Sequence, residues 1–299
     1  MMLKSEPSKL DAIIHKFCAP LFATEWNAVG GHNAQSLNAT VTFIKRKGKY
    51  YAVTCHHVLE GFRGEATRRN TILSPSLHMP RMVQQLHHLT GRELRWSFHS
   101  CRDFIGEADM DNAEAIDRLQ RENASRPDIA IADISVSWEI LTRVRKDVGI
   151  EAIDLDSYVE PDWSNVGDVW MAFGFPNDHK DELGEHVAAP MVHIAAELQS
   201  KPFDPNREGF VLLSELAARH GWGFSGVSGG PALVPFNDDD ERVSFVGLTY
   251  EGAPSKTGHE SGDELVGPAT IFLMCLRLTP SAFDGWLKEA RFGVSFALD

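Results

Sequence analysis

The segment Gly226-Val227-Ser228-Gly229-Gly230-Pro231 decides the fold, because it presents a serine within a glycine-rich turn. A serine flanked by glycines is a candidate nucleophile. The two glycines and the proline that follow Ser228 are poor helix formers, so no helix is expected directly behind it. The apolar run at 232–234 instead predicts a buried strand. The segment therefore predicts a displayed serine before a strand, although a plain Gly-rich β-turn with an incidental serine has the same pattern.

Gly226 has a further physical role in this turn. Glycine adopts a positive φ that other residues avoid. In that conformation the N–H groups of Gly226 and Ser228 would point at one spot. Two such donors stabilise the oxygen of a tetrahedral intermediate, so the segment predicts an oxyanion hole at Gly226 and Ser228.

A nucleophilic serine needs a base, and the base needs a group that orients it. The stretch 50–55, rich in aromatic and β-branched residues, runs directly into His56 and His57. Further along, Asp128 stands at the head of the apolar stretch 129–132. The candidates therefore follow one another in the order histidine, aspartate, serine.

Motifs in this order resemble those of the trypsin-like (chymotrypsin-fold) serine proteases. They are Val53-Thr54-x-x-His57-Val58, Asp128-Ile129-Ala130 and Gly226-x-Ser228-Gly229-Gly230-Pro231. A fourth motif, Val166-Gly167-Asp168-Val169-Trp170-Met171-Ala172-Phe173-Gly174-Phe175-Pro176, is similar to a strand and turn of the bacterial HtrA-type branch. It departs from that pattern at Trp170, where the branch has valine. The resemblance covers roughly residues 20–280.

The resemblance implies an all-β fold of two six-stranded antiparallel β-barrels, with N-terminal and C-terminal helices and helical insertions. Residues 1–150 would form the N-terminal helix and the first barrel, which carries the histidine and the aspartate. Residues 151–299 would form the second barrel, which carries the serine, and the C-terminal helix.

The resemblance also implies the roles of the three candidates. His57 would be the general base, Asp128 the group that orients it, and Ser228 the nucleophile. His56 is the competing base, but it would lie on the opposite side of the strand end because side chains alternate along a strand.

Apolar residues at helical spacing predict helices over 8–17, 112–123, 139–145 and 281–291. The first of these is expected to pack on the first barrel, and Ser281 is expected to cap the last. Lys47-Gly48 predicts the turn of a hairpin whose second strand, 49–54, leads to His57 on the turn after it. The pair His87-His88 is not expected to bind a metal, since adjacent strand residues point apart.

The resemblance places the substrate-binding positions at Trp222, Ser225, Tyr250, Glu251 and Gly252. No aspartate stands at position 222, so a pocket for arginine or lysine of the trypsin type is not expected there. Trp222 and Tyr250 favour an apolar or small substrate side chain, whereas Glu251 would favour a basic one.

Composition limits the partners and the location. The 299 residues carry a formal net charge of −13, which argues against nucleic acid and anionic membranes as partners. The four cysteines are scattered, and Val58 stands where secreted relatives carry a cysteine beside the histidine, which favours a reducing compartment. With no signal-peptide pattern at the N-terminus, we expect a cytoplasmic protein. No metal or cofactor is expected.

The expected function is that of a serine endopeptidase, a regulatory or quality-control protease whose substrate is a polypeptide. Val227 stands where zymogens of the trypsin type have an aspartate, so any control would come from elsewhere, such as a protein activator. The stretch after Pro280 is too short for the PDZ module of many HtrA proteases. The alternative is a catalytically poor peptide-binding or scaffold module on the same fold. An α/β-hydrolase is disfavoured because His259, the only histidine after Ser228, follows too closely.

Overall fold

The computed structural model describes residues 13–27, 31–69, 73–76, 96–106, 111–144, 146, 149–176, 181–183, 186–188, 190–200, 203–216, 226–236, 239–254, 259–261, 264–266 and 269–294. Its helices are α2 (His56–Arg69), α4 (Ala113–Asn123), α5 (Ser135–Val144) and α6 (Pro280–Glu289). Its strands are β1 (Cys18–Asn27), β2 (Gly31–Arg46), β3 (Lys49–Thr54), β4 (Leu73–Ser76), β5 (Phe98–Ser100), β6 (Ala130–Asp133), β7 (Ile153–Asp154), β8 (Val169–Gly174), β9 (Asp181–Leu183), β10 (His186–Ala188), β11 (Val192–Leu198), β12 (Gly209–Leu216), β13 (Pro231–Phe236), β14 (Asp239–Pro254), β15 (His259–Ser261), β16 (Glu264–Val266), β17 (Ala269–Arg277) and β18 (Phe292–Val294).

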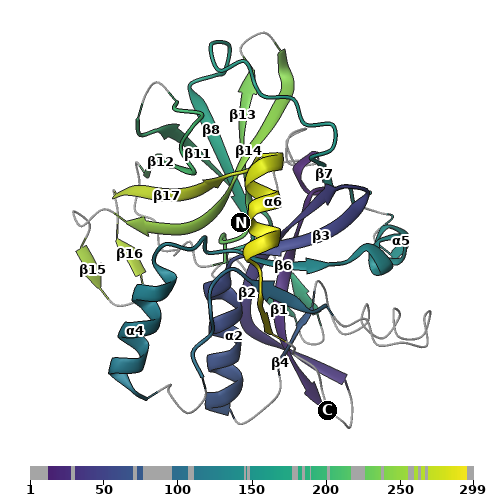
Figure 1. Ribbon diagram of the computed structural model, residues 1–299, viewed down its shortest axis with the longest axis vertical. Helices are drawn as coiled ribbons and strands as arrows, with labels where there is room; N and C mark the ends of the chain where they lie inside the picture. Colours follow the sequence, from purple (N-terminus) through teal and green to yellow (C-terminus); the bar gives the residue numbers. More distant parts are fainter. Residues whose placement is uncertain are drawn as a thin grey trace.

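Six strands of the second half close into an antiparallel barrel in the order β11-β12-β17-β14-β13-β8 (Figure 1). Alternate residues of its strands face inward, as the burial of every second residue along the end of β11 shows. The interior is filled by large apolar side chains, among them Trp170, Ile194, Leu212, Ile271 and Leu273. The expectation of a six-stranded antiparallel barrel is confirmed here.

The second sheet has eight strands, in the order β18-β5-β6-β3-β2-β1-β4 with β7 paired to β2. All of them except β7 and β18 come from the first half of the chain, and β18 is the last strand in the sequence. Its outer strands β4 and β18 do not pair with each other within the described part of the chain, so this sheet is open there. A second closed barrel is therefore not confirmed.

The hairpin between β2 and β3 turns at Lys47-Gly48, as expected. Both residues have positive φ, 52° and 70°, as in the two-residue turn that matches the twist of paired strands. The carboxylate of Asp156 accepts both backbone N–H groups, from Lys47 at 2.6 Å and from Gly48 at 3.0 Å. The turn thus fixes the register of β3 against β2, and β3 leads to His57.

One expectation about local structure is wrong: His57 does not stand on a turn, because α2 begins at His56, immediately behind β3. Val58, Leu59 and Phe62 recur at helical spacing and pack into the core of the open sheet. That burial makes 56–69 a helix, which its polar composition had concealed. His57 consequently lies in the first turn of α2.

The other helices fall near their expected places. α4 begins one residue after Asn112, whose side chain accepts the N–H groups of Glu114 and Ala115. α5 begins four residues before the expected start. The cap of α6 is Thr279 and not Ser281, since Pro280 takes the first helical position, where its missing N–H costs nothing. No helix among the described residues is long and apolar enough to cross a membrane.

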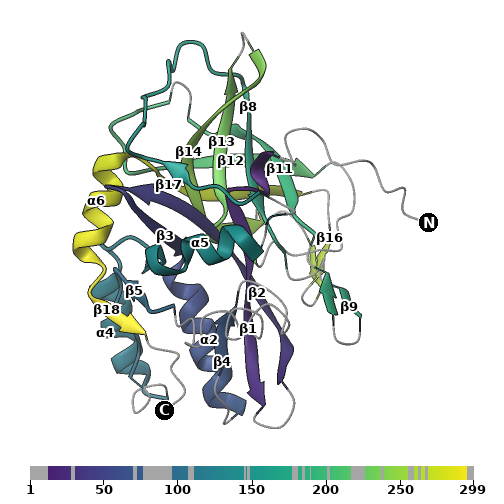
Figure 2. The same cartoon turned by 90° about the vertical axis from the view of Figure 1, so that its right-hand side faces the viewer.

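The segments near both ends of the described chain pack against the two sheets. Residues 8–12 of the expected first helix lie outside the described residues, and only 13–14 are helical before a turn. Ile14 packs with Phe173, Phe175 and Leu233 on the closed-barrel side, whereas Phe17 packs in the core of the open sheet and its carbonyl oxygen accepts Phe43 N–H at 2.8 Å. This segment thus contacts both sheets, not the first alone. α6 follows the closed barrel yet packs on the open sheet, as Figures 1 and 2 show. The division at residue 150 stays a prediction.

Candidate active site

Ser228 lies on a tight turn directly before β13. Gly226 has φ 101° and Gly229 has φ 90°, the left-handed region in which side chains are strained. The turn is closed by a hydrogen bond from Gly230 N–H to Val227 O at 2.9 Å. The expected positive φ at Gly226 is therefore observed.

Close backbone packing around the serine turn requires glycine at three positions, 174, 229 and 230. A Cβ at Gly230 would overlap the carbonyl oxygen of Phe173, and one at Gly229 would overlap the carbonyl oxygen of Thr40. A Cβ at Gly174, which ends β8, would lie 2.7 Å from the Cα of Val227. The turn after β8 and the serine turn thus pack backbone against backbone.

Two threonines from β2, which no sequence pattern singled out, hold the serine turn in place. Thr40 Oγ1 donates to Gly226 O at 2.7 Å while it accepts Phe175 N–H at 3.0 Å. Thr42 Oγ1 donates to Gly229 O at 2.7 Å. These bonds join the open sheet to the turn of the closed barrel, and they are fully buried.

The three predicted side chains form a hydrogen-bonded series. His57 Nδ1 lies 2.9 Å from Asp128 Oδ2, and His57 Nε2 lies 3.1 Å from Ser228 Oγ. An ionised Asp128 accepts the Nδ1 proton, which leaves Nε2 as the acceptor that faces the serine hydroxyl. That tautomer is the one a general base requires.

Asp128 also fixes the backbone of α2. Its Oδ1 accepts the backbone N–H of His57 at 3.1 Å, one of the first-turn N–H groups that lack a partner inside the helix. Asp128 is 7% exposed. Its burial opposes ionisation, but the hydrogen bond and charge of His57, together with the charge of Arg102, outweigh that effect and lower the pKa of Asp128.

Arg102 is a second contact of Asp128 that the sequence did not indicate. Its Nη1 lies 3.3 Å from Asp128 Oδ2, the oxygen that also faces His57. Arg102 lies shortly after β5, and the β5–β6 pairing brings it to Asp128. Nothing in the local sequence around position 102 signals this contact, because it depends on strand order.

His56, the competing base, points away from the serine. Its Nδ1 lies 2.9 Å from Ser100 Oγ and its Nε2 lies 3.3 Å from Glu60 Oε2, so both ring nitrogens are occupied. The ring is 3% exposed and packs on Phe104. The hydrogen bond from His56 lowers the pKa of Glu60. His56 is thus a buried packing residue in this structure.

The predicted oxyanion hole consists of the N–H groups of Gly226 and Ser228. Within the described part of the chain, neither donates a hydrogen bond to another backbone group. The hydrogen bond of Thr40 to Gly226 O fixes one end of the turn. The oxyanion hole at Gly226 and Ser228 stays a prediction.

Of the five expected substrate-binding positions, Trp222 and Ser225 lie outside the described residues. Tyr250 is brought to the nucleophile, since Ser228 Oγ lies 3.3 Å from its carbonyl oxygen as a second possible acceptor. Glu251 and Gly252 follow on β14 with exposed side-chain positions. The three described positions thus form an edge that starts at the serine.

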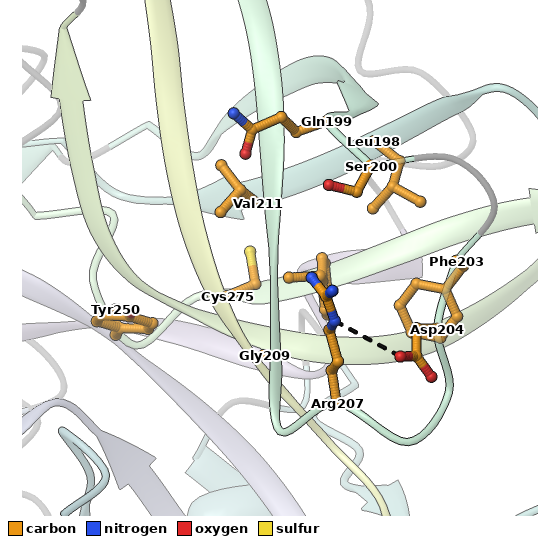
Figure 3. A pocket seen from close by; sticks show the side chains of 11 residues that line it. Leu198, Gln199, Ser200, Phe203, Asp204, Arg207, Gly209, Val211, Tyr250 and Cys275 are labelled. Atoms are coloured by element: carbon orange, nitrogen blue, oxygen red, sulfur yellow. Dashed lines mark ion pairs between the residues drawn. The ribbon is translucent and has the colours of Figure 1, made fainter. Parts of the chain in front are cut away.

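Tyr250 also lines a hollow of about 400 Å³ (Figure 3). The loop between β11 and β12 forms the far wall, where Asp204 and Arg207 are paired at 3.5 Å. The lining also includes the apolar side chains of Leu198, Phe203, Phe210 and Val211 and the polar ones of Gln199 and Ser200.

All four cysteines are buried free thiols, Cys18, Cys55, Cys101 and Cys275. Among the residues that the structure describes, no group of three or more histidine, cysteine, aspartate or glutamate side chains is arranged to hold a metal ion. His87-His88 lies outside the described residues.

No protein-family model matches the chain, and no curated protein matches its sequence significantly.

Proposed function

We propose that this chain is a serine endopeptidase that hydrolyses peptide bonds through an acyl-enzyme intermediate. One observation carries the proposal: residues 57, 128 and 228, far apart in the sequence, meet in a series of hydrogen bonds at 2.9 and 3.1 Å. Such a series, with the acid buried and the histidine half-exposed, performs nucleophilic catalysis on several unrelated folds.

The proposed reaction has two halves. Ser228 Oγ attacks the carbonyl carbon of the substrate as His57 Nε2 takes its proton, and Asp128 stabilises the imidazolium. The N–H groups of Gly226 and Ser228 stabilise the oxyanion, and losing one such donor costs about 10²–10³ in turnover. His57 then protonates the leaving amine. Water, activated by His57, releases the acyl group from the serine.

A polypeptide is the proposed substrate. The stretch of β14 that begins at Tyr250 starts beside the nucleophile, and Glu251 and Gly252 are exposed on it. An extended peptide laid along this edge gains main-chain hydrogen bonds, and neighbouring hollows select its side chains. No nucleic acid, membrane, metal or cofactor has a part in this proposal.

We further propose that the open sheet corresponds to the first barrel of the trypsin-like fold, and that the chain belongs near the HtrA-type branch. The support is that His57 and Asp128 stand where β3 ends and β6 begins, and that Gly174 packs on the serine turn. The free buried thiols favour a reducing compartment, and we propose the cytoplasm.

Control by a protein activator is part of the same proposal. Val227 is 2% exposed and apolar, so the position next to the serine offers no carboxylate to a new N-terminus. If purified protein digested unfolded substrates at full rate by itself, the activator would be unnecessary and this part of the proposal would be wrong.

The test is labelling by a fluorophosphonate probe, which reacts with activated serines. Wild type should be labelled, and Ser228→Ala and His57→Ala should each abolish labelling. Ser164→Ala is a matched control, since Ser164 is a surface serine that hydrogen-bonds to Asp162. Failure of the wild type to react, alone and with candidate activators, would leave the peptide-binding module as the function.

A further inference from the structure

The hollow lined by Tyr250 begins beside the candidate nucleophile. The Tyr250 carbonyl oxygen lies 3.3 Å from Ser228 Oγ, and Figure 3 shows Tyr250 and Asp204 at opposite ends of the hollow. The volume of the hollow is about 400 Å³. A cavity of about 150 Å³ is enough to hold a benzene molecule. The hollow therefore has room for a side chain with a ring, and Tyr250 places it next to a peptide bound at Ser228.

One wall of the hollow is aromatic and firmly packed. Phe203 and Phe210 line the hollow, and their ring centroids lie 5.7 Å apart at an angle of 76°. Behind them, Phe203 packs on Trp163 with 4.1 Å between ring centroids, and both phenylalanines pack on Trp170 at 5.4 Å. Trp170 is 2% exposed and belongs to the core of the closed barrel. The two phenylalanine rings are thus held in place by the barrel core.

A wall of this kind favours a ring as the ligand. Aromatic side chains pair edge to face or in offset stacks at centroid separations of about 4.5–7 Å, and such a pair contributes more than the burial of its apolar area alone. An aliphatic side chain of similar size gains the burial without the pairing. The wall formed by Phe203 and Phe210 therefore favours an aromatic side chain over an aliphatic or a small one.

The polar part of the lining gives little advantage to a charged side chain. Arg207 Nε and Asp204 Oδ2 are paired at 3.5 Å, and the two side chains are 69% and 48% exposed. A carboxylate that approached Arg207 would also meet Asp204, and the reverse holds for an ammonium group. Exposed ion pairs contribute little in any case. Gln199 and Ser200 are uncharged, and their polar groups can bond to a hydroxyl on a ring.

We propose that the hollow binds an aromatic side chain, of phenylalanine or tyrosine, in a polypeptide that lies at Ser228, and that it thereby determines which sequences the site accepts. Apart from Tyr250, the described residues that line it lie outside the five positions expected from the sequence. The inference rests on the proposed function for the cleavage at Ser228, but the binding of a peptide is measurable without cleavage.

The test uses the full-length Ser228→Ala variant, which lacks the nucleophile and so can bind a peptide without cleaving it. Extended peptides are identical except for one position, which carries phenylalanine, tyrosine, leucine, glycine, aspartate or lysine, and this position is moved along the peptide. Calorimetry measures each dissociation constant. Burial of a whole aromatic side chain strengthens binding by about 10–100-fold. Because Asp204 and Arg207 leave the rim exposed, we expect the phenylalanine and tyrosine peptides to bind about tenfold more tightly than the glycine peptide, with leucine between them.

A second variant fills the hollow. Ser200 is exposed, and Figure 3 shows its side chain pointing into the hollow, so Ser200→Phe adds a ring there without disturbing the core. In the Ser228→Ala background it should abolish the preference for phenylalanine and leave the affinity for the glycine peptide unchanged. Gln120→Phe is the matched control, because it adds the same ring at an exposed position of α4 and should leave the preference intact.

Three results would overturn the inference. The first is equal affinity for the phenylalanine and glycine peptides at every position, or no measurable binding of either. The second is tightest binding of the aspartate or lysine peptide, which would assign the selectivity to a charged residue such as Arg207 or Glu251. The third is a preference for phenylalanine that survives Ser200→Phe, because the ring would then bind elsewhere. The first two results need no variant of the hollow, so they stay decisive if Ser200→Phe does not fold.

The two proposals can fail separately. If the preference for phenylalanine behaves as stated but the wild type is not labelled by fluorophosphonate and cleaves no peptide, the hollow binds aromatic side chains in a peptide-binding module and the endopeptidase fails. If the wild type is labelled but binding and cleavage are the same for all the peptides, the endopeptidase stands and the inference about the hollow is wrong.

Discussion

Gly229→Ala tests why the serine turn is built from glycine. The residue has φ 90°, and its N–H donates to Thr249 O at 2.7 Å. A methyl group would overlap the Thr40 carbonyl oxygen and lie 2.7 Å from Thr54 Oγ1. Neither neighbour can move away cheaply, because one is backbone and the other belongs to a buried strand.

The loss of stability in Gly229→Ala has two parts. The left-handed conformation costs a non-glycine residue about 1–2 kcal/mol. Overpacking of a filled site adds about 1–3 kcal/mol. We expect the free energy of unfolding to fall by about 2–5 kcal/mol, a large part of the 5–15 kcal/mol that is typical of folded domains.

Gly48→Ala provides the matched control. Gly48 has φ 70°, but a Cβ there would meet nothing within 4 Å. The free energy of unfolding should therefore fall by about 1–2 kcal/mol, the conformational part alone. Urea unfolding followed by tryptophan fluorescence measures both, since the chain has seven tryptophans. Equal losses in the two variants would show that close packing of the serine turn does not contribute, and would refute the reasoning.

Three further predictions concern Asp128, the stability of the protein at low pH and the reactivity of the thiols. Asp128→Asn should reduce the rate of fluorophosphonate labelling by about 10⁴, because an amide leaves His57 in the wrong tautomer, while the thermal midpoint changes little. An unreduced rate would exclude a role of Asp128 in activating the serine. The hydrogen bond from Arg46 lowers the pKa of Asp284 to about 2, so the stability from this pair is present above the ordinary value of 3.8 and is lost as pH falls toward 2. Asp284→Asn should weaken the protein at pH 6 and not at pH 2 in urea titrations, and an equal loss at both would contradict the assignment. Burial raises the pKa of Cys18, Cys101 and Cys275 to about 12, so the native protein should not react with a thiol reagent at pH 8, whereas the denatured chain should expose four thiols.

Local sequence patterns predicted much of the candidate site. Ser228, His57 and Asp128 each stand beside a strand or turn signal, and Gly226 was expected to have positive φ for the reason that the turn now provides. The strand over 49–54 was predicted from the turn at Lys47-Gly48 and its β-branched and aromatic content, and β3 has these bounds. These features depend on neighbours in sequence, which is why they could be predicted.

Other features depended on contacts that sequence proximity does not encode. α2 is helical because Val58, Leu59 and Phe62 find the core of the open sheet, although the segment is polar overall. Ile14 packs on the closed barrel because the open sheet brings β1 beside β8. Tertiary burial overrides weak local propensity in such places.

The sequence by itself determined the chemistry of the candidate site: which residue types are present, in which order, and that glycine surrounds the serine. Only the tertiary structure decided which histidine faces Ser228. It also decided that Thr40 and Thr42 hydrogen-bond to the serine turn, and that Arg102 and His57 both contact Asp128. The physical reason is that residue type fixes what a group can donate, accept or titrate. Strand order and helix position fix which groups come within 3 Å of one another, and no local pattern records that.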